Sequence, residues 1–155
     1  MKNTSMALRI AFAFWLAIFS AGAVLAQDQV RITADTFVVE EDSTVATFTG
    51  NVFVTQTDLT VNADKVVVRY GEGGTSDIKS LEASGGLVIT TPEQKVTGNK
   101  GIYDPRTRIM IVTGNVKVVS ASGTVTGPSL EVNFDTRTTR FTGQGNGRVT
   151  GVFNP

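Results

Sequence analysis

FTGNVFV, residues 48–54, returns as VTGNVKV at 112–118, and ASGGLVI at 83–89 has the same pattern with other letters. Each copy places a pair of turn-forming residues between residues that favour β-strands. A glycine inside a strand marks a bulge or a sharp corner, because the missing Cβ removes a steric limit on the backbone. We therefore predict a corner within a long strand at each copy. A plain hairpin turn is the alternative.

The corners belong to a repeat of about 29 residues. Gly50, Gly85, Gly114 and Gly143 are separated by 35, 29 and 29 residues. The second unit has six extra residues, which fall in the glycine-rich stretch 70–77 and predict a lengthened surface turn. Any fold proposed for the chain has to accommodate this period.

Around each corner the hydrophobic residues alternate with a period of two. The alternation predicts half-buried strands, and no stretch beyond residue 26 has a convincing helical period. Corners in line would fold a long antiparallel meander into two sheets that face each other. The residues on the inner side would be Ile32, Phe37, Val39, Phe48, Val52, Val54, Val61, Val66, Val68, Leu81, Leu87, Ile89, Val96, Met110, Val112, Val116, Val118, Val125, Leu130, Val132 and Phe141.

The first 26 residues have the anatomy of a secretory signal peptide. Lys2 and Arg9 precede an uncharged run from residue 10 to 26, and Val24 and Ala26 are small residues before a cut at Gln27. The run is 17 residues long, shorter than the ~20 that a spanning helix needs. We predict cleavage, which leaves 27–155 as one domain; a retained membrane anchor is the alternative.

The composition excludes several classes of function. Cleavage would remove 2 of 14 basic and none of 14 acidic residues, leaving 12 and 14, a net charge of −2. This is not the basic excess of a general nucleic-acid binder. The chain has no Cys and no His, which excludes thiol nucleophiles, histidine bases and zinc sites with the usual ligands. We expect no catalytic site, no metal site and no cofactor.

The corners TGNV.V, with the segments V..AD and VTG....YD, resemble those of the LptA/OstA-like periplasmic lipopolysaccharide-transport proteins, over essentially all of 27–155. The resemblance implies an OstA-like twisted antiparallel β-jellyroll of V-shaped strands, open at both ends. It implies a periplasmic protein of outer-membrane biogenesis in Gram-negative bacteria, which carries lipopolysaccharide from the inner to the outer membrane in an apolar interior. The implied partners are lipopolysaccharide, inner-membrane LptC-like and outer-membrane receiver jellyrolls, and further copies stacked head to tail.

The inner residues would then line a groove for lipid acyl chains. Alternation alone favours a dry core, and only the resemblance favours the groove. The two end strands, 29–41 and 139–153, would pair with other chains, because an open jellyroll leaves its edges exposed. The glycines after residue 142 could instead blunt the second edge. The edge residues singled out are Val30, Arg31, Ile32 and Thr33, and Phe141, Thr142, Arg148 and Val149.

Three alternatives stay open. One is an LptC-like, membrane-anchored partner in the same pathway, with the same jellyroll. Another is a parallel β-solenoid, although its enzymes usually cluster carboxylates at matched positions and here only Asp35 and Asp64 match. The third is an exported structural module that binds no lipid.

Overall fold

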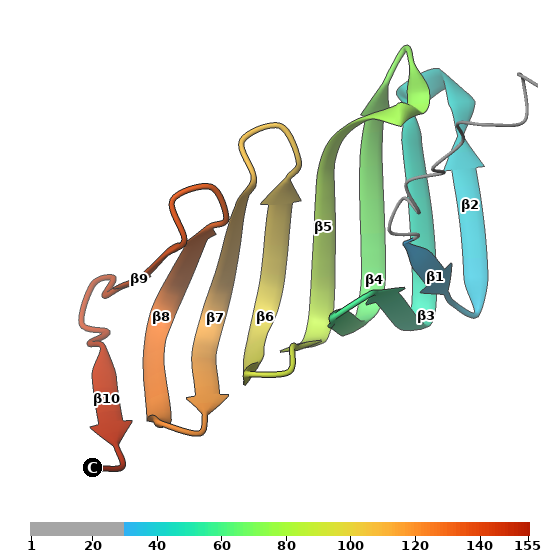
Figure 1. The fold of residues 1–155 in the computed structure, drawn as a ribbon. Helices are drawn as coiled ribbons and strands as arrows, with labels where there is room; N and C mark the ends of the chain where they lie inside the picture. The colour runs from blue at the N-terminus through green and yellow to red at the C-terminus, as the bar shows by residue number, and fades with distance from the viewer. Residues whose placement is uncertain (1–29) are drawn as a thin grey trace, which may run out of the picture.

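The computed structural model describes residues 30–155, so the signal peptide predicted at 1–26 lies outside the described residues. The described chain is almost entirely β-strand (Figure 1). In this part of the chain, no helix has the length and apolar character needed to cross a membrane. The elements are β1 (Arg31–Thr33), β2 (Thr36–Glu40), η1 (Glu41–Ser43), β3 (Val45–Gln56), β4 (Leu59–Gly71), β5 (Gly74–Thr90), β6 (Gln94–Asp104), β7 (Ile109–Ser120), β8 (Gly123–Asn133), β9 (Thr138–Thr142) and β10 (Thr150–Phe153).

The strands form one sheet in which neighbours in sequence are neighbours in space. The order is β1-β3-β4-β5-β6-β7-β8-β10, with β2 paired to β3 and β9 paired to β8. Every pairing is antiparallel. The predicted antiparallel meander is therefore confirmed, and the parallel solenoid is wrong, because its rungs would pair in parallel.

Three of the four predicted corners are β-bulges. Pairing breaks between Thr49 and Val52, between Ser84 and Leu87, and between Thr113 and Val116, where two residues face one of the next strand. Both bulged residues have positive φ: 83° and 46° at 50–51, 81° and 55° at 85–86, and 83° and 48° at 114–115. Glycine adopts this conformation without strain and asparagine more easily than other residues. This requirement explains the Gly-Asn and Gly-Gly pairs.

The first residue of each bulge must be glycine for a second reason. A side chain from the preceding strand, or at the first corner from the connection between β1 and β2, lies directly over it. A Cβ placed on Gly50, Gly85 and Gly114 would lie 3.0, 2.7 and 2.7 Å from the Cβ atoms of Asp35, Asp64 and Asn99, respectively. At the first corner, Asn51 Nδ2 also donates a hydrogen bond of 3.0 Å to Asp35 Oδ2. Asp35 and Asp64, which match in the repeat, thus pack over the corner glycines.

The fourth corner differs from the prediction. β9 ends at Thr142 and β10 begins at Thr150, so Gly143 opens an irregular connection of several residues. The strand beneath this connection carries Pro128 at the position of Asp64 and Asn99, and a Cβ on Gly147 would lie 2.7 Å from Pro128 Cγ. Proline has no amide N–H for a ladder hydrogen bond, which favours the break.

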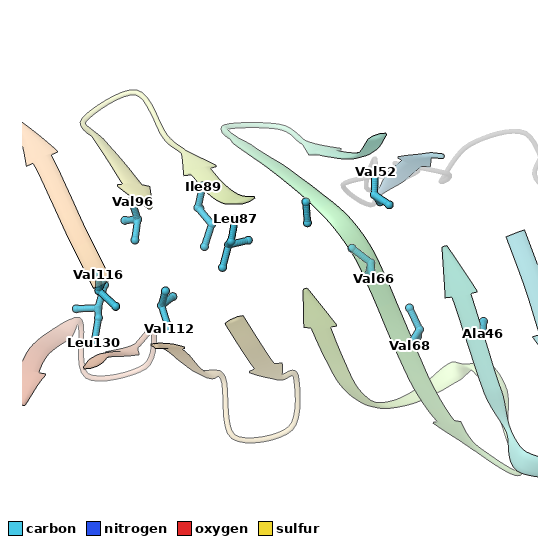
Figure 2. Packing of buried hydrophobic residues seen from close by; sticks show 11 residues of the cluster. Ala46, Val52, Val66, Val68, Leu87, Ile89, Val96, Val112, Val116 and Leu130 are labelled. Carbon is cyan, nitrogen blue, oxygen red and sulfur yellow. The ribbon is translucent and has the colours of Figure 1, made fainter. Parts of the chain in front are cut away.

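The corners divide the sheet into two arms. The upper arm ends in the turns around residues 72–73, 105–108 and 134–137, and the lower arm ends in the turns around 57–58, 92–93 and 121–122 (Figure 1). Their inner faces pack together. In Figure 2, Leu87, Ile89 and Val96 lie on one side of the interior, and Val112 and Leu130 on the other. The buried core is Ala46, Val52, Ala63, Val66, Val68, Leu87, Ile89, Val96, Val112, Val116 and Leu130.

The six extra residues of the second unit lengthen two strands more than they lengthen a turn. The turn is confined to residues 72–73, and β4 and β5 continue on either side of it. Tyr70 pairs with Ile78, and both pack against the core. The prediction of a surface turn over 70–77 is therefore wrong for most of these residues. Val66, Val68 and Tyr70 continue the alternation along β4, so the apolar inner face extends farther toward the tip of this hairpin than in the other hairpins.

Candidate functional site

The predicted inner residues fall into two layers according to burial. Next to the corners is a buried layer, in which Val52, Leu87, Val112, Val116 and Leu130 are each no more than 1% exposed. A half-buried layer lies farther from the corners or at the two ends of the sheet. The half-buried layer consists of Ile32, Phe48, Val54, Val61, Leu81, Met110, Val118, Val125, Val132 and Phe141.

The layers differ in what can reach them. The buried layer is a close-packed core, so a ligand could contact it only if the arms moved apart. The half-buried layer keeps part of its apolar surface open to solvent. Any apolar ligand bound with the arms in this position therefore contacts the half-buried layer.

The interior offers no polar group that could fix a ligand. Among the described residues, no polar or charged side chain is buried, and no buried side-chain nitrogen or oxygen is without a hydrogen-bond partner. Contacts with such a surface depend on area and not on direction. The arrangement suits a flexible hydrocarbon chain, which has no hydrogen bonds to satisfy.

The end of the sheet at β2 exposes apolar side chains. Phe37 and Val39, which were predicted to point inward, are 56% and 46% exposed on the last strand of the upper arm. The ring of Phe37 stacks on Phe48 with centroids 4.5 Å apart. Phe37 therefore covers the ring of Phe48 at this end of the sheet. Phe37 has a β-strand neighbour on one side only.

Both sheet edges are open within the described residues. At the first edge, β1 and β2 pair only with β3; at the second, β9 and β10 pair only with β8. Of the predicted edge residues, Arg31, Ile32 and Thr33 form β1, and Phe141 and Thr142 end β9. Val30 precedes β1, whereas Arg148 and Val149 lie in the connection before β10. An open pocket of about 460 Å³ beside β1 is lined by Val30, Arg31, Thr55, Gln56 and Thr57.

The ion pairs of the described residues lie on the upper arm, several of them near its tips. Lys79 Nζ lies 2.7 Å from Asp77 Oδ1, and Arg108 Nε lies 2.9 Å from Asp135 Oδ1. The hydrogen bond from Lys79 lowers the pKa of Asp77 below 3.8. The amide N–H of Arg106, which donates to Asp104 over 2.9 Å, lowers the pKa of Asp104 in the same way. These carboxylates stay ionised and stabilise the turns.

The predicted inner residues left out several contributors to the interior, among them Ala46, Ala63 and Gly101. Gly101 lies on the inner face of β6 beside Leu87, and it is buried. The repeat contained the signal, because the matching positions in the neighbouring units are occupied by Val66 and Leu130. A large residue replaced by glycine in one unit indicates that another side chain fills the space.

This architecture, an open antiparallel jellyroll with an apolar interior, is shared with known transport proteins. A family model described as "LptA/(LptD N-terminal domain) LPS transport protein" matches residues 31–138. The chain belongs to this family. The fold class and family predicted from the corner motifs are thereby confirmed.

Individual relatives agree with the family match. The chain is 32% identical over 123 residues to an uncharacterized protein of Rhizobium meliloti (strain 1021), covering 74% of this chain and 66% of that protein. It is 25% identical over 158 residues to the lipopolysaccharide export system protein LptA of Haemophilus influenzae, covering 95% and 91%. The crystal structure of LptH, the LptA-homologous periplasmic component of the lipopolysaccharide transport device of Pseudomonas aeruginosa, superposes with a TM-score of 0.72 at 17% identity, covering 83% and 96%. The superposition shows the same jellyroll fold.

Proposed function

We propose that this protein is a periplasmic bridge that carries lipopolysaccharide from the inner to the outer membrane. The acyl chains of the lipopolysaccharide lie against the half-buried layer, and the sheet edges of the protein join it to neighbouring jellyrolls. The observation that carries the proposal is the apolar interior, which has no buried polar or charged side chain among the described residues, in a chain of the lipopolysaccharide-transport family.

The energetics of acyl-chain contact favour both binding and movement. Each CH₂ group that leaves water gains about 0.8 kcal/mol, so a few methylenes against Met110, Val118 and Val132 hold a chain reversibly. Because the contacts have no preferred direction, a chain can slide along the layer while it exchanges one aliphatic neighbour for the next. A bound lipid is therefore retained without being fixed in place.

The open edges support the second part of the proposal. Unpaired strands at both ends offer backbone N–H and C=O groups to another chain. Pairing of the β1–β2 edge with the β9–β10 edge of a second copy is head to tail and does not close into a ring. The same edges serve for the inner-membrane LptC-like and outer-membrane receiver jellyrolls, which extends the apolar interior from one protein to the next.

A photocrosslinking experiment tests the proposed interior. A photoreactive residue at Val118, in the half-buried layer, should crosslink to purified lipopolysaccharide. The matched control is the adjacent Lys117, which is exposed and points to the outer face, and which should not crosslink. Equal labelling at the two positions would contradict the proposed groove.

The mass of the protein purified from periplasm separates the bridge from a membrane-anchored, LptC-like protein. Cleavage after Ala26 gives a chain that begins at Gln27. Lipid extracted from the same sample should contain lipopolysaccharide. An uncut chain recovered only from the membrane fraction favours the anchored partner.

A further inference from the structure

The units of the repeat differ at one position of the inner wall. On the upper arm, the position two residues after Asp64, Asn99 and Pro128 is occupied by Val66 in β4, Gly101 in β6 and Leu130 in β8. On the lower arm, directly after each bulge, stand Val52, Leu87 and Val116. The glycine of the upper arm thus occurs in the middle of the sheet, alongside the only leucine of the lower-arm set.

These two residues are in contact. A Cβ on Gly101 would lie 2.9 Å from Leu87 Cδ2, and a Cβ on Gly98 would lie 2.6 Å from Val112 Cγ1. Gly98 and Gly101 lie on either side of the corner of β6. Leu87 therefore reaches from the lower arm to the upper arm, and Val112 reaches from the upper arm to the lower. The two side chains pass each other over a strand that has no side chain to separate them.

Burial on the lower arm extends farther from the corner at this place. Ile89 and Val96, on β5 and β6, are 5% and 4% exposed. Their equivalents in the neighbouring units are only half-buried, including Val118, which is also on an internal strand. In Figure 2, Leu87 and Ile89 lie across the interior from Val112. Burial on the lower arm is thus deepest at β5 and β6, whereas on the upper arm it extends farthest at β3 and β4, with Ala46 and Val68.

We infer that β5 and β6 form the narrow point of the interior and that Leu87, seated on Gly101, is the side chain that a passing acyl chain displaces. This inference rests on the proposed function and adds a positioning residue to it. The narrow point separates two stretches of the half-buried layer. One contains Phe48, Val54 and Val61, and the other contains Met110, Val118 and Val132.

Displacement at this point exchanges one aliphatic contact for another. A methylene chain that enters between the arms replaces Leu87 against Gly101, and no hydrogen bond or ion pair of the interior has to break. The lipid thus pauses on either side and passes when the arms part. The fit between leucine and glycine sets how closely the arms approach.

Spin-label distances between the arm tips test the inference in the full-length mature chain. The chain has no Cys, so cysteines introduced at Glu93 and Thr107, both exposed, report on the arms near β6. A second pair at Asp58 and Glu72 reports on the first units. In the absence of lipid, Gly101→Ala should lengthen the distance of the first pair and leave that of the second pair unchanged.

A volume-neutral double variant is the matched control. Leu87→Val removes the methylene that Gly101→Ala adds, so the combination should restore the wild-type distance. Exchange of bound fluorescent lipopolysaccharide should be several-fold faster in Gly101→Ala than in the double variant. If Gly101→Ala does not fold, Leu87→Ala, which empties the space beside Gly101 without adding atoms, should accelerate the exchange of lipopolysaccharide to a similar extent.

The outcomes separate the two proposals. A wild-type distance in Gly101→Ala, or wild-type exchange in Leu87→Ala, would overturn the narrow point even if lipopolysaccharide binds. A protein that binds no lipopolysaccharide would overturn the proposed function, while the lipid-free distances would still decide whether Leu87 sets the spacing of the arms.

Discussion

Replacing Gly85 by alanine should destabilise the fold more than the same change at the next residue. Gly85 has φ of +81°, and its absent Cβ would lie 2.7 Å from Asp64 Cβ. The left-handed backbone costs an alanine about 1–2 kcal/mol, and displacing Asp64 adds about 1–3 kcal/mol of overpacking. The free energy of unfolding should therefore fall by about 2–5 kcal/mol.

Gly86 provides the matched controls. It has φ of +55° and no neighbouring atom within 4 Å of its absent Cβ, so Gly86→Ala should cost only the about 1–2 kcal/mol of backbone strain. Gly86→Asn should cost less still, because Asn51 and Asn115 occupy the equivalent positions with φ of 46° and 48°.

Urea unfolding followed by far-UV circular dichroism measures these differences at one temperature. Gly85→Ala should cost less in an Asp64→Gly background, because glycine at position 64 removes the Cβ that the new methyl group would meet, and only the backbone strain is left. The explanation of the corner would be refuted if Gly85→Ala and Gly86→Ala were equally stable, or if Gly85→Ala cost as much with Asp64→Gly as it does in the wild type.

Three further predictions concern packing, pH and association. Leu130→Ala, at a site 1% exposed, should lower the free energy of unfolding by about 2.7–5 kcal/mol, whereas Ile111→Ala, 40% exposed on the outer face, should cost well under half as much in the same urea titration; equal losses would contradict the assignment of the inner and outer faces. The pKa of Asp104 is lowered from 3.8, so its contribution to stability is present above pH 3.8 and is lost as the pH falls through the lower folded-state pKa; the gap between the unfolding midpoints of wild type and Asp104→Asn should be largest near neutral pH and close in acid, and a gap independent of pH would exclude the charge as its cause. Thr36→Pro, on the free edge strand β2, should weaken concentration-dependent self-association in size-exclusion chromatography with light scattering while the circular dichroism stays that of a folded protein; unchanged association of the folded variant would argue against pairing at that edge.

The corners illustrate how much of the fold could be predicted from local patterns. A backbone that bends with two consecutive positive φ angles accepts few residue types, so the corners at Gly50, Gly85 and Gly114 can be recognised from the sequence. The alternation on either side assigns each side chain to the inner or outer face. Both constraints act within a few residues, and for this reason the strands, their order and the corners were predictable.

The fourth corner and the second unit show where local patterns fail. Gly143 has the right spacing, but the strand beneath it carries Pro128, and the chain leaves the sheet until residue 150. The extra residues of the second unit contain three glycines and were predicted as a turn. Tyr70 and Ile78 pair across the hairpin and turn most of them into strand. In both cases the deciding contact comes from another strand.

The sequence alone determined the antiparallel meander, its bends and the set of side chains that face inward, because these follow from φ angles and from a period of two. Only the tertiary structure decided which inward side chains are sealed and which remain accessible. That division depends on how closely two arms approach across each corner. At the corner of β6, Leu87 lies against Gly101, and these residues, 14 positions apart in the sequence, have volumes that complement each other only in the folded sheet.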